Sequence, residues 1–257
     1  ITNPFQGVIM KVAVLGAAGW VGRAVLENFA GKHEVRAFEI NPEAWDVYRD
    51  IDGEWEGEKV YGDIADFHAV DKALEGMDGV VHLTAYFGGE KPPEEDEKPF
   101  LVNVKGLWNV LESARQRELV RVVHMGSCQV EHPEGIFFSA DIRRPDASLY
   151  AVGKRLQEEL CRQYHDAYAL RIIVFRPASI IDTRSNTGRD GQPAGGGTSW
   201  VCRHDLAQAC HLALESTTID FDIMHTAGHP EAEKYCNVAR SRELLGLEYK
   251  GQLAGEA

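Results

Sequence analysis

Three glycines at positions 16, 19 and 22 follow an apolar run of strand length and open a segment with helical spacing. A strand that passes directly into a helix through glycines leaves bare backbone N–H groups at the first helical turn. Such a helix start attracts phosphate charge, and glycine lets a pyrophosphate approach the backbone closely. The spacing G-x-x-G-x-x-G therefore favours a parallel α/β fold that binds a dinucleotide. The alternative is a tight turn without a ligand.

Strand and helix patterns alternate along the rest of the chain. Continuous apolar strands joined by helices predict a doubly wound parallel sheet, or Rossmann fold, with helices on both faces. We expect a single domain over residues 1–257, with residues 8–170 mainly forming the nucleotide-binding core. Residues 171–257 then supply the last strands and a small C-terminal substrate lobe. The predicted strands are 8–15, 34–40, 79–84, 120–125 and 171–175, and the predicted helices are 21–30, 67–74, 100–119 and 149–167.

Net charge and cysteine content limit the possible partners. The chain has 27 basic and 40 acidic residues, a formal charge of −13, which disfavours binding to nucleic acid or an anionic membrane. It contains no apolar run of the roughly 20 residues that a membrane helix requires. Residues 1–9 lack signal-peptide features and are interpreted as an extension. Five cysteines without a Cys-x-x-Cys pair predict reduced thiols and a cytoplasmic protein.

The ten histidines show no spacing typical of metal ligands. No metal site is therefore expected. His82 and His124 fall in apolar strands and are interpreted as hydrogen-bonded core residues. Two segments are predicted to be loops, the Pro-rich charged segment 90–99 and the Gly-rich segment 183–198. The second is either a mobile lid or a disordered segment.

Glu39 ends the second predicted strand, 23 residues after Gly16. A carboxylate there accepts hydrogen bonds from the adenosine ribose hydroxyls and repels a 2′-phosphate. This favours NAD over NADP. The alternative is an exposed acidic residue at a strand end.

Tyr150 and Lys154 are four residues apart in a predicted helix, so they share one face. Tyrosine titrates near pH ~10, and a nearby ammonium favours its phenolate. Tyr150 is thus a candidate general acid or base at a carbinol or carbonyl. Ser127 follows a predicted strand, 23 residues before Tyr150, and its hydroxyl either holds the same substrate oxygen or caps a turn.

With these motifs the chain resembles the extended short-chain dehydrogenase/reductase family, in its NAD-dependent epimerase/dehydratase group. The resemblance runs from about Lys11 to about Ala213. It implies Ser127, Tyr150 and Lys154 as the catalytic residues, with Lys154 also holding the nicotinamide ribose. The stretches that carry it are GAAGWVG, GDIAD at 62–66, VVHLTA at 80–85, NVKGLWNVLESA at 103–114, YAVGK, FRPASI at 175–180 and RHDLAQA at 203–209. The cofactor-binding residues so implied are Gly16, Ala18, Gly19, Trp20, Val21, Gly22, Glu39, Asp63, Ile64, Leu83, Thr84, Ala85, Asn103, Lys154, Pro177 and Ala178.

Within this group the chain is short and resembles uronate dehydrogenases, which oxidise free hexuronates to lactones. The matching stretches are EKPFLVNVKGLWNVLESAR, LYAVGKRLQEELCRQY and TSWVCRHDLAQAC. Between residues 171 and 203, five arginines and two aspartates give a local charge of +3, which favours an anionic substrate. The alternative is that these arginines serve packing and ion pairs. The implied substrate residues are Ser127, Cys128, Gln129, Tyr150, Arg184 and Arg189.

The sequence therefore predicts an NAD-dependent oxidoreductase that acts on a sugar acid or a related sugar. One alternative is a nucleotide-sugar 4-epimerase or dehydratase that uses the same three residues. Another is a non-enzymatic regulator that senses NAD. The family resemblance also implies a homodimer formed through the helices at 100–119 and 149–167.

Overall fold

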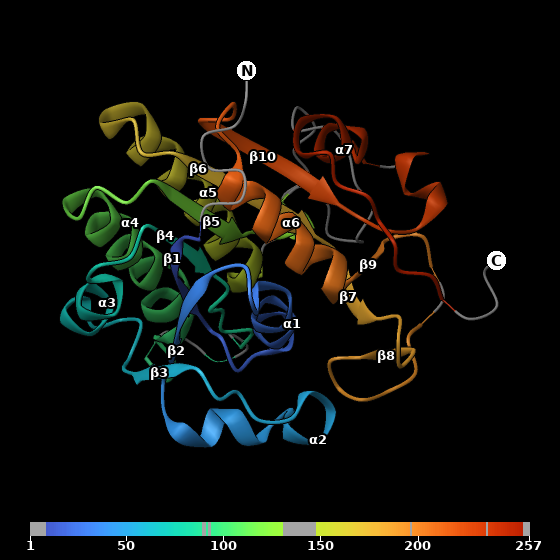
Figure 1. Ribbon diagram of the computed structural model, residues 1–257, viewed down its shortest axis with the longest axis horizontal. Coiled ribbons are helices and arrows are strands. Elements are labelled where there is room, and N and C mark those ends of the chain that lie inside the picture. The colour runs from blue at the N-terminus through green and yellow to red at the C-terminus, as the bar shows by residue number, and fades with distance from the viewer. Residues whose placement is uncertain are drawn as a thin grey trace.

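The central sheet contains seven parallel strands in the order β10-β6-β5-β4-β1-β2-β3 (Figure 1). The computed structural model describes residues 9–88, 91, 94–130, 148–195, 197–234 and 236–253. The chain adds strands outward from β1 to β3, then crosses to β4 on the other side of β1, as in a doubly wound fold. The strands are β1 (Lys11–Leu15), β2 (Glu34–Glu39), β3 (Glu58–Tyr61), β4 (Gly79–His82), β5 (Arg121–Met125), β6 (Ile172–Pro177) and β10 (Phe221–Thr226).

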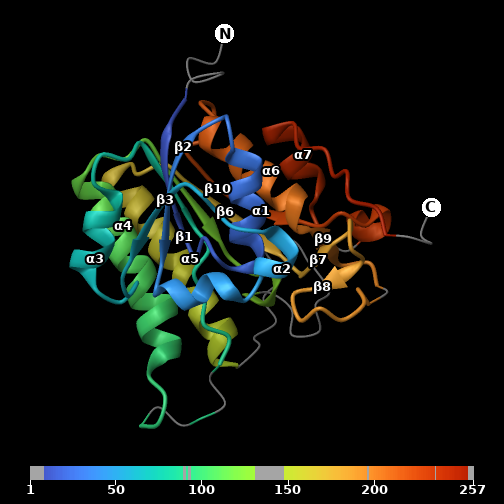
Figure 2. The ribbon, with the colours of Figure 1, turned by 60° about the horizontal axis from the view of Figure 1, so that its bottom comes forward.

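Helices cover both faces of this sheet (Figure 2). On one face lie α1 (Trp20–Phe29) and α6 (Arg203–Glu215), which pack against each other. The opposite face carries α3 (Phe67–Leu74), α4 (Gly106–Gln116) and α5 (Leu149–Tyr168).

Alternate side chains of each strand enter the two cores. In β1, Val12 and Val14 belong to the core beneath α1 and α6, whereas Ala13 and Leu15 belong to the core beneath α3, α4 and α5. All four side chains are fully buried. This two-sided burial explains why the strand sequences read as continuous apolar runs.

A smaller mixed sheet follows the seven-stranded one. β7 (Ser179–Asp182) pairs antiparallel with β8 (Thr187–Gly188) and parallel with β9 (Trp200–Cys202). Together with α7 (Ala239–Leu245), this sheet forms the C-terminal part of the structure (Figure 1). The remaining short helices are η1 (Pro42–Asp46), α2 (Arg49–Asp52), η2 (Pro99–Lys105), η3 (Cys128–Val130) and η4 (Pro230–Lys234).

The predicted doubly wound α/β class is confirmed, and each predicted strand and helix is present within a few residues of its expected bounds. The predicted helix 100–119 differs in detail, because its first part, η2, is π-helical and its regular part ends at Gln116. The Gly-rich segment 183–198 is not wholly irregular, since it contains β8.

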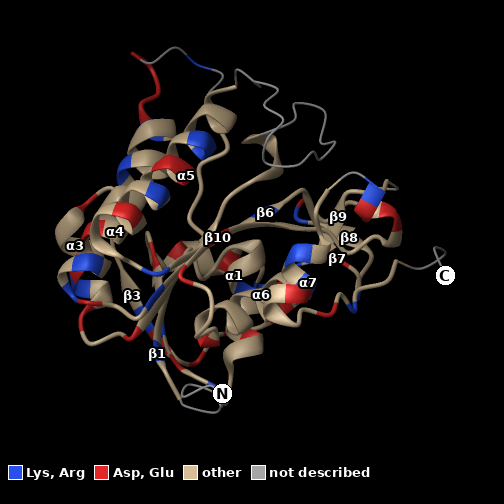
Figure 3. Ribbon diagram, turned by 90° about the horizontal axis from the view of Figure 1, so that it is seen from above, with Lys and Arg blue, Asp and Glu red and all other residues tan. Residues whose placement is uncertain are grey.

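Charged residues of both signs occur along α4, α5 and α7 (Figure 3). None of the helices in the described part of the chain combines the length and the hydropathy needed to span a membrane.

Candidate active site

The three glycines form a bare turn between β1 and α1. Gly16 has a φ of +84°, and a Cβ on it would lie 2.9 Å from the Thr84 backbone nitrogen. A Cβ on Gly22 would overlap the Gly16 carbonyl oxygen. Gly19 is the N-cap residue of α1, and no side chain caps this helix start. The first N–H groups of α1 are thus positioned for an anion, and the turn fits a cofactor pyrophosphate.

Glu39, at the end of β2, faces this turn. Its Oε1 accepts a hydrogen bond from Ala18 N at 2.9 Å and its Oε2 accepts one from Ile40 N at 3.2 Å. Burial raises the pKa of this carboxyl, and the two backbone N–H groups oppose the rise. Arg36 is directed elsewhere, to Glu58 at 2.8 Å, so it does not displace Glu39 from the position expected for a ribose contact.

A cleft of about 980 Å³ lies at the carboxyl ends of the central strands, where doubly wound folds bind ligands. It joins the glycine turn to the start of α5. The expected cofactor residues that line it are Gly16, Gly19, Trp20, Val21, Gly22, Glu39, Leu83, Thr84, Ala85, Lys154, Pro177 and Ala178. The expected catalytic and substrate residues that line it are Ser127, Cys128, Gln129, Tyr150, Lys154 and Arg189.

Ser127, Tyr150 and Lys154 meet in this cleft. Ser127 lies just beyond β5 and is 6% exposed, and its hydroxyl lies close enough to the Tyr150 phenol to lower the pKa of that group. Lys154, one turn along α5 from Tyr150, donates from Nζ to Met125 O at 2.8 Å. Its Nζ lies 5.7 Å from the centre of the Tyr150 ring. This arrangement can hold a substrate oxygen at Tyr150 and Ser127.

The pKa of Tyr150 is raised in this structure, whereas the sequence led us to expect a lowered one. Desolvation raises the pKa of Tyr150 to about 12, and the Ser127 hydrogen bond opposes this rise. Burial lowers the pKa of Lys154 to about 8, against the opposing effect of Glu158. Lys154 is not among the groups that shift the Tyr150 pKa in this structure, because its ammonium points to the Met125 carbonyl, so the lowering of the Tyr150 pKa by Lys154 stays a prediction. Ser127 and Arg189 are the neighbours that favour the phenolate.

A buried ion pair lies behind Lys154. Arg176 donates from Nε and Nη2 to the two Glu158 oxygens at 2.7 and 2.6 Å, and both side chains are nearly buried. Glu158 is on α5, four residues after Lys154, and Arg176 is on β6. Sequence reasoning missed Glu158, although its position one helical turn from Lys154 was a usable signal.

Two aromatic residues that the sequence did not single out shape the cleft. Phe87 stacks on Tyr150 with ring centres 5.2 Å apart and planes at 24°. Arg189, from the Gly-rich segment, lies 4.1 Å above the Phe87 ring. The Tyr48 hydroxyl donates to Arg189 O at 3.2 Å, so this segment covers part of the cleft. No spacing in the sequence links these residues, which come from three separate loops.

The arginines between residues 171 and 203 mostly form ion pairs. Arg171, Arg176 and Arg203 pair with acidic side chains. Arg184 pairs with Glu27 at 2.8 Å, is 61% exposed and is not among the residues that line the cleft. Arg184 therefore does not lie where a substrate in the cleft would contact it, contrary to the expectation from the sequence. Arg189 alone of the five lines the cleft, and no ion pair to it is found within the described residues.

The remaining expected cofactor residues, Ala18, Asp63, Ile64 and Asn103, are not among the residues that line the cleft. Asp63 Oδ1 accepts from Ala65 N at 2.8 Å, and Ile64 is buried beside α4. The buried Asn103 side chain bonds the backbone N–H and carbonyl of Tyr86, each at 2.8 Å, and so braces the loop after β4. Ala18 contributes its N–H to Glu39.

His82 and His124 are hydrogen-bonded core residues, as expected. Their Nδ1 atoms lie 2.9 Å apart on neighbouring strands, and both side chains are fully buried. Burial lowers the pKa of His82 to about 3 and that of His124 well below its usual range.

Comparisons with known proteins identify the family of the chain. A model of the NAD dependent epimerase/dehydratase family matches residues 12–195. L-arabinose 1-dehydrogenase (NAD(P)(+)) from Haloferax volcanii is 26% identical over 255 residues, which cover 92% of this chain and 94% of that protein. Uronate dehydrogenase from Pseudomonas putida is 28% identical over 234 residues, which cover 88% of this chain and 78% of that protein.

Two solved structures have a similar fold. Uronate dehydrogenase from Agrobacterium tumefaciens superimposes with a TM-score of 0.73 and 25% identity, covering 94% of this chain and 85% of that one. UDP-glucuronic acid 4-epimerase from Bacillus cereus, in complex with NAD, gives a TM-score of 0.75 at 19% identity. The shared region covers 95% of this chain and 94% of the epimerase.

Proposed function

Because the chain belongs to the NAD-dependent epimerase/dehydratase family, we propose that it is a dehydrogenase that oxidises a sugar acid or a related sugar with NAD. The observation that carries this proposal is the meeting of Ser127, Tyr150 and Lys154 in the cleft that also contains the glycine turn. The similarity to the L-arabinose 1-dehydrogenase and uronate dehydrogenase relatives supports a free sugar or sugar acid as substrate.

The bare turn at Gly16 and Gly22 would hold the pyrophosphate of NAD, and Glu39 would accept hydrogen bonds from the adenosine ribose. Bound in this way, NAD would supply the hydride acceptor. The carboxylate of Glu39 would disfavour a 2′-phosphate, which supports NAD over NADP. The remaining cofactor contacts proposed from the family resemblance include Lys154 at the nicotinamide ribose.

In the proposed reaction, Tyr150 removes the proton of the hydroxyl group at the anomeric carbon. Ser127 holds the same oxygen by a hydrogen bond. As the O–H proton leaves to Tyr150, the hydrogen on the carbon leaves as hydride, so the sugar loses two electrons and becomes a lactone. The charge of Lys154 stabilises the phenolate once a bound substrate and cofactor exclude water from the cleft.

Arg189 is the proposed partner of a substrate carboxylate. It lines the cleft, and its guanidinium covers the Phe87 ring, which in turn stacks on Tyr150. An arginine can bind a carboxylate through two parallel hydrogen bonds. Cys128 and Gln129 line the cleft on the Ser127 side and would contact the sugar there.

The direct test of the catalytic assignment is Tyr150→Phe. This change removes the phenol oxygen and keeps the ring that stacks on Phe87. We expect turnover to fall by at least ~10²-fold, the range typical of general acid–base catalysis, with NAD affinity changed less than about twofold. Retained turnover would show that Tyr150 does not transfer the proton.

A 4-epimerase or dehydratase is the second candidate, since the same residues and the same fold could serve it. Such an enzyme keeps its nicotinamide bound through the cycle and shows no net reduction. Cys128 and Gln129, which follow Ser127, are neutral and count against a dehydratase, which needs an acid near this position. A regulator that only senses NAD has no use for the Tyr150–Lys154 pair, so that pair counts against it.

A homodimer through α4 and α5 is also proposed. These helices and the adjoining η2 expose Phe100, Trp108 and Leu156 at 43%, 50% and 41%. Sedimentation of the wild-type protein beside Trp108→Glu tests the proposal. We expect a dimer that the glutamate converts to a monomer, whereas a monomeric wild-type protein would contradict it.

A further inference from the structure

Three potential metal ligands meet at the end of the sheet opposite the cleft. His33 lies in the turn between α1 and β2, and His211 and Glu215 are four residues apart at the end of α6. One ligand atom from each side chain lies within 4.8 Å of the others. We propose that His33, His211 and Glu215 bind one divalent transition-metal ion, of which Zn²⁺ is the test case.

The side-chain distances suit a small ion. His211 faces His33 with one ring nitrogen and Glu215 with the other: His33 Nε2 lies 2.9 Å from His211 Nδ1, and His211 Nε2 lies 3.7 Å from Glu215 Oε2. A single ion binds only one of these nitrogens, and a set with one ligand atom from each residue lies within 4.8 Å. With bonds of about 2.0–2.2 Å, two ligand atoms on a tetrahedral zinc ion are roughly 3.3 Å apart. Rotation of the three side chains would bring one atom of each to this spacing, and the ion would then take the place of the His33–His211 hydrogen bond. Two imidazoles and one carboxylate leave a fourth position for water.

The surroundings favour neutral, coordinating imidazoles. His33 is 8% exposed, and within the described ranges its Nδ1 is buried without a hydrogen-bond partner. The Phe29 ring packs edge-on against both histidines, with ring centres 5.0 and 6.2 Å away. Burial lowers the pKa of His33 and lowers that of His211 to about 4, so neither proton must be removed near pH 7. Desolvation raises the pKa of Glu215, and a bound cation would offset the unfavourable burial of its carboxylate.

One charged group opposes the ion. The Lys32 ammonium acts on all three side chains, lowering the pKa of His33, His211 and Glu215. Its Nζ donates to Asn28 Oδ1 at 3.0 Å on the protein surface. A cation at the cluster must therefore bind against the repulsion of Lys32. Removing the Lys32 charge should then strengthen binding of the cation, which can be tested.

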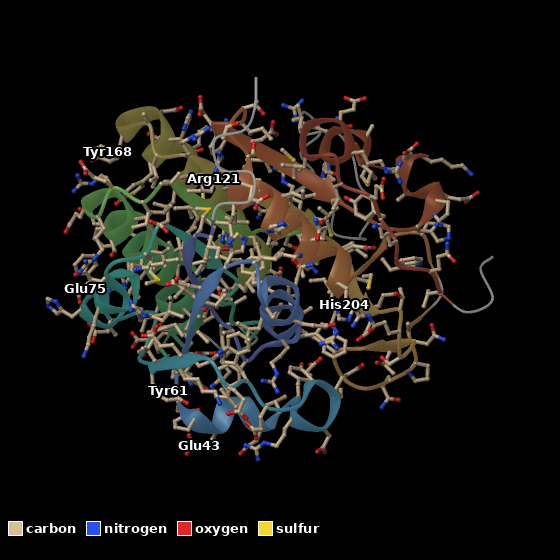
Figure 4. All side chains as sticks on the ribbon, viewed as in Figure 1. Glu43, Tyr61, Glu75, Arg121, Tyr168 and His204 are labelled. Atoms are coloured by element: carbon tan, nitrogen blue, oxygen red, sulfur yellow. The ribbon has the colours of Figure 1, made fainter. Side chains whose placement is uncertain are left out.

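The site would join the turn after α1 to the end of α6, away from the cleft. Figure 4 shows His204 and Arg121 at opposite ends of α6. Arg121 bonds the carbonyls of Ser216 and Ile219, just beyond Glu215, so the cluster lies at the Arg121 end. His204, by contrast, is at the end beside the small sheet. The bound ion would thus stabilise the fold and take no part in hydride transfer, and its presence is independent of the proposed function.

The experiment is a titration of the purified, metal-free full chain with Zn²⁺ against a chromophoric chelator, at 25 °C where the protein stays folded. We expect one equivalent to bind. His211→Ala should weaken binding at least tenfold, and Glu215→Gln should weaken it by a smaller factor. His68→Ala removes an exposed histidine of α3 and is the matched control, with unchanged affinity.

Lys32→Met provides a variant that leaves the ligands in place. Loss of the repelling charge should tighten Zn²⁺ binding several-fold. In thermal unfolding, Zn²⁺ at a hundred times its Kd should raise the Tm of the wild-type protein by roughly 5–10 °C. Failure of the wild-type protein to bind one equivalent, equal binding by His211→Ala, or unchanged or weaker binding by Lys32→Met would each overturn the proposal.

Discussion

The buried pair of Glu158 and Arg176 gives the sharpest prediction about stability. The Arg176 side chain is 8% exposed and the Glu158 side chain 10%, and two hydrogen bonds of 2.7 and 2.6 Å join them. Glu158→Gln removes one charge and leaves the guanidinium buried. Breaking a buried pair in this way typically costs about 3–5 kcal/mol. For a chain of this size, that corresponds to a Tm lower by roughly 6–20 °C.

The control is the double variant Glu158→Met, Arg176→Met, which removes both charges and keeps most of the volume. Because apolar side chains can replace a buried pair with little loss, the double variant should recover most of the lost stability. Urea unfolding at pH 7 measures the free energy of unfolding of all three proteins. A Glu158→Gln variant as stable as wild type, or a double variant less stable than the single one, would refute this account of the pair.

Four further changes have definite expected outcomes. Glu158→Gln removes the carboxylate that raises the Lys154 pKa, so kcat/KM should begin to fall at a lower alkaline pH than in the wild-type protein. An unchanged pH profile would disprove the effect of Glu158 on Lys154. Gly22→Ala places a Cβ against the Gly16 carbonyl, so calorimetric titration should show at least tenfold weaker NAD binding. Wild-type affinity in this variant would count against the glycine turn as the pyrophosphate site. Arg189→Ala should raise KM for a uronate more than tenfold but leave a neutral sugar within about threefold; equal effects would argue against a carboxylate contact. Since His82 has a folded-state pKa of about 3, below its unfolded value of about 6.5, its contribution to stability is complete above pH ~6.5 and is lost as pH falls towards 3. The urea midpoint should therefore fall between pH 7 and pH 5 and fall less in His82→Gln, and an equal fall in both would contradict this.

The local patterns of the sequence predicted most of the large sheet. Strands buried on both faces, such as β1 and β5, have runs of apolar residues that identify them directly. β3 and β10, the two edge strands, were missed, and the β3 sequence, EKVY, is short and half polar. β7, β8 and β9 have two to four residues each, and their pairing depends on contacts between distant segments that no local pattern records.

The candidate site was predictable where its chemistry lies in one segment. The glycine turn and the Tyr150–Lys154 spacing each lie within a single strand–helix or helix unit. Phe87 and Tyr48 could not be found, since tertiary structure alone brings their loops to Arg189 and Tyr150. Arg184 was misjudged for the same reason, because its partner Glu27 is far away in the sequence. The direction of the Tyr150 pKa also depends on burial, which spacing does not reveal.

The central claim is net oxidation of a sugar substrate by NAD at the Ser127, Tyr150 and Lys154 site. Its most direct test is the absorbance of reduced nicotinamide, followed with NAD and NADP separately across a panel of free uronic acids and neutral sugars. The account predicts turnover with NAD and a uronate, and slower turnover with NADP because of Glu39. A protein that binds NAD tightly yet reduces none of it with any member of the panel would contradict the account and favour an epimerase, a dehydratase or a sensor.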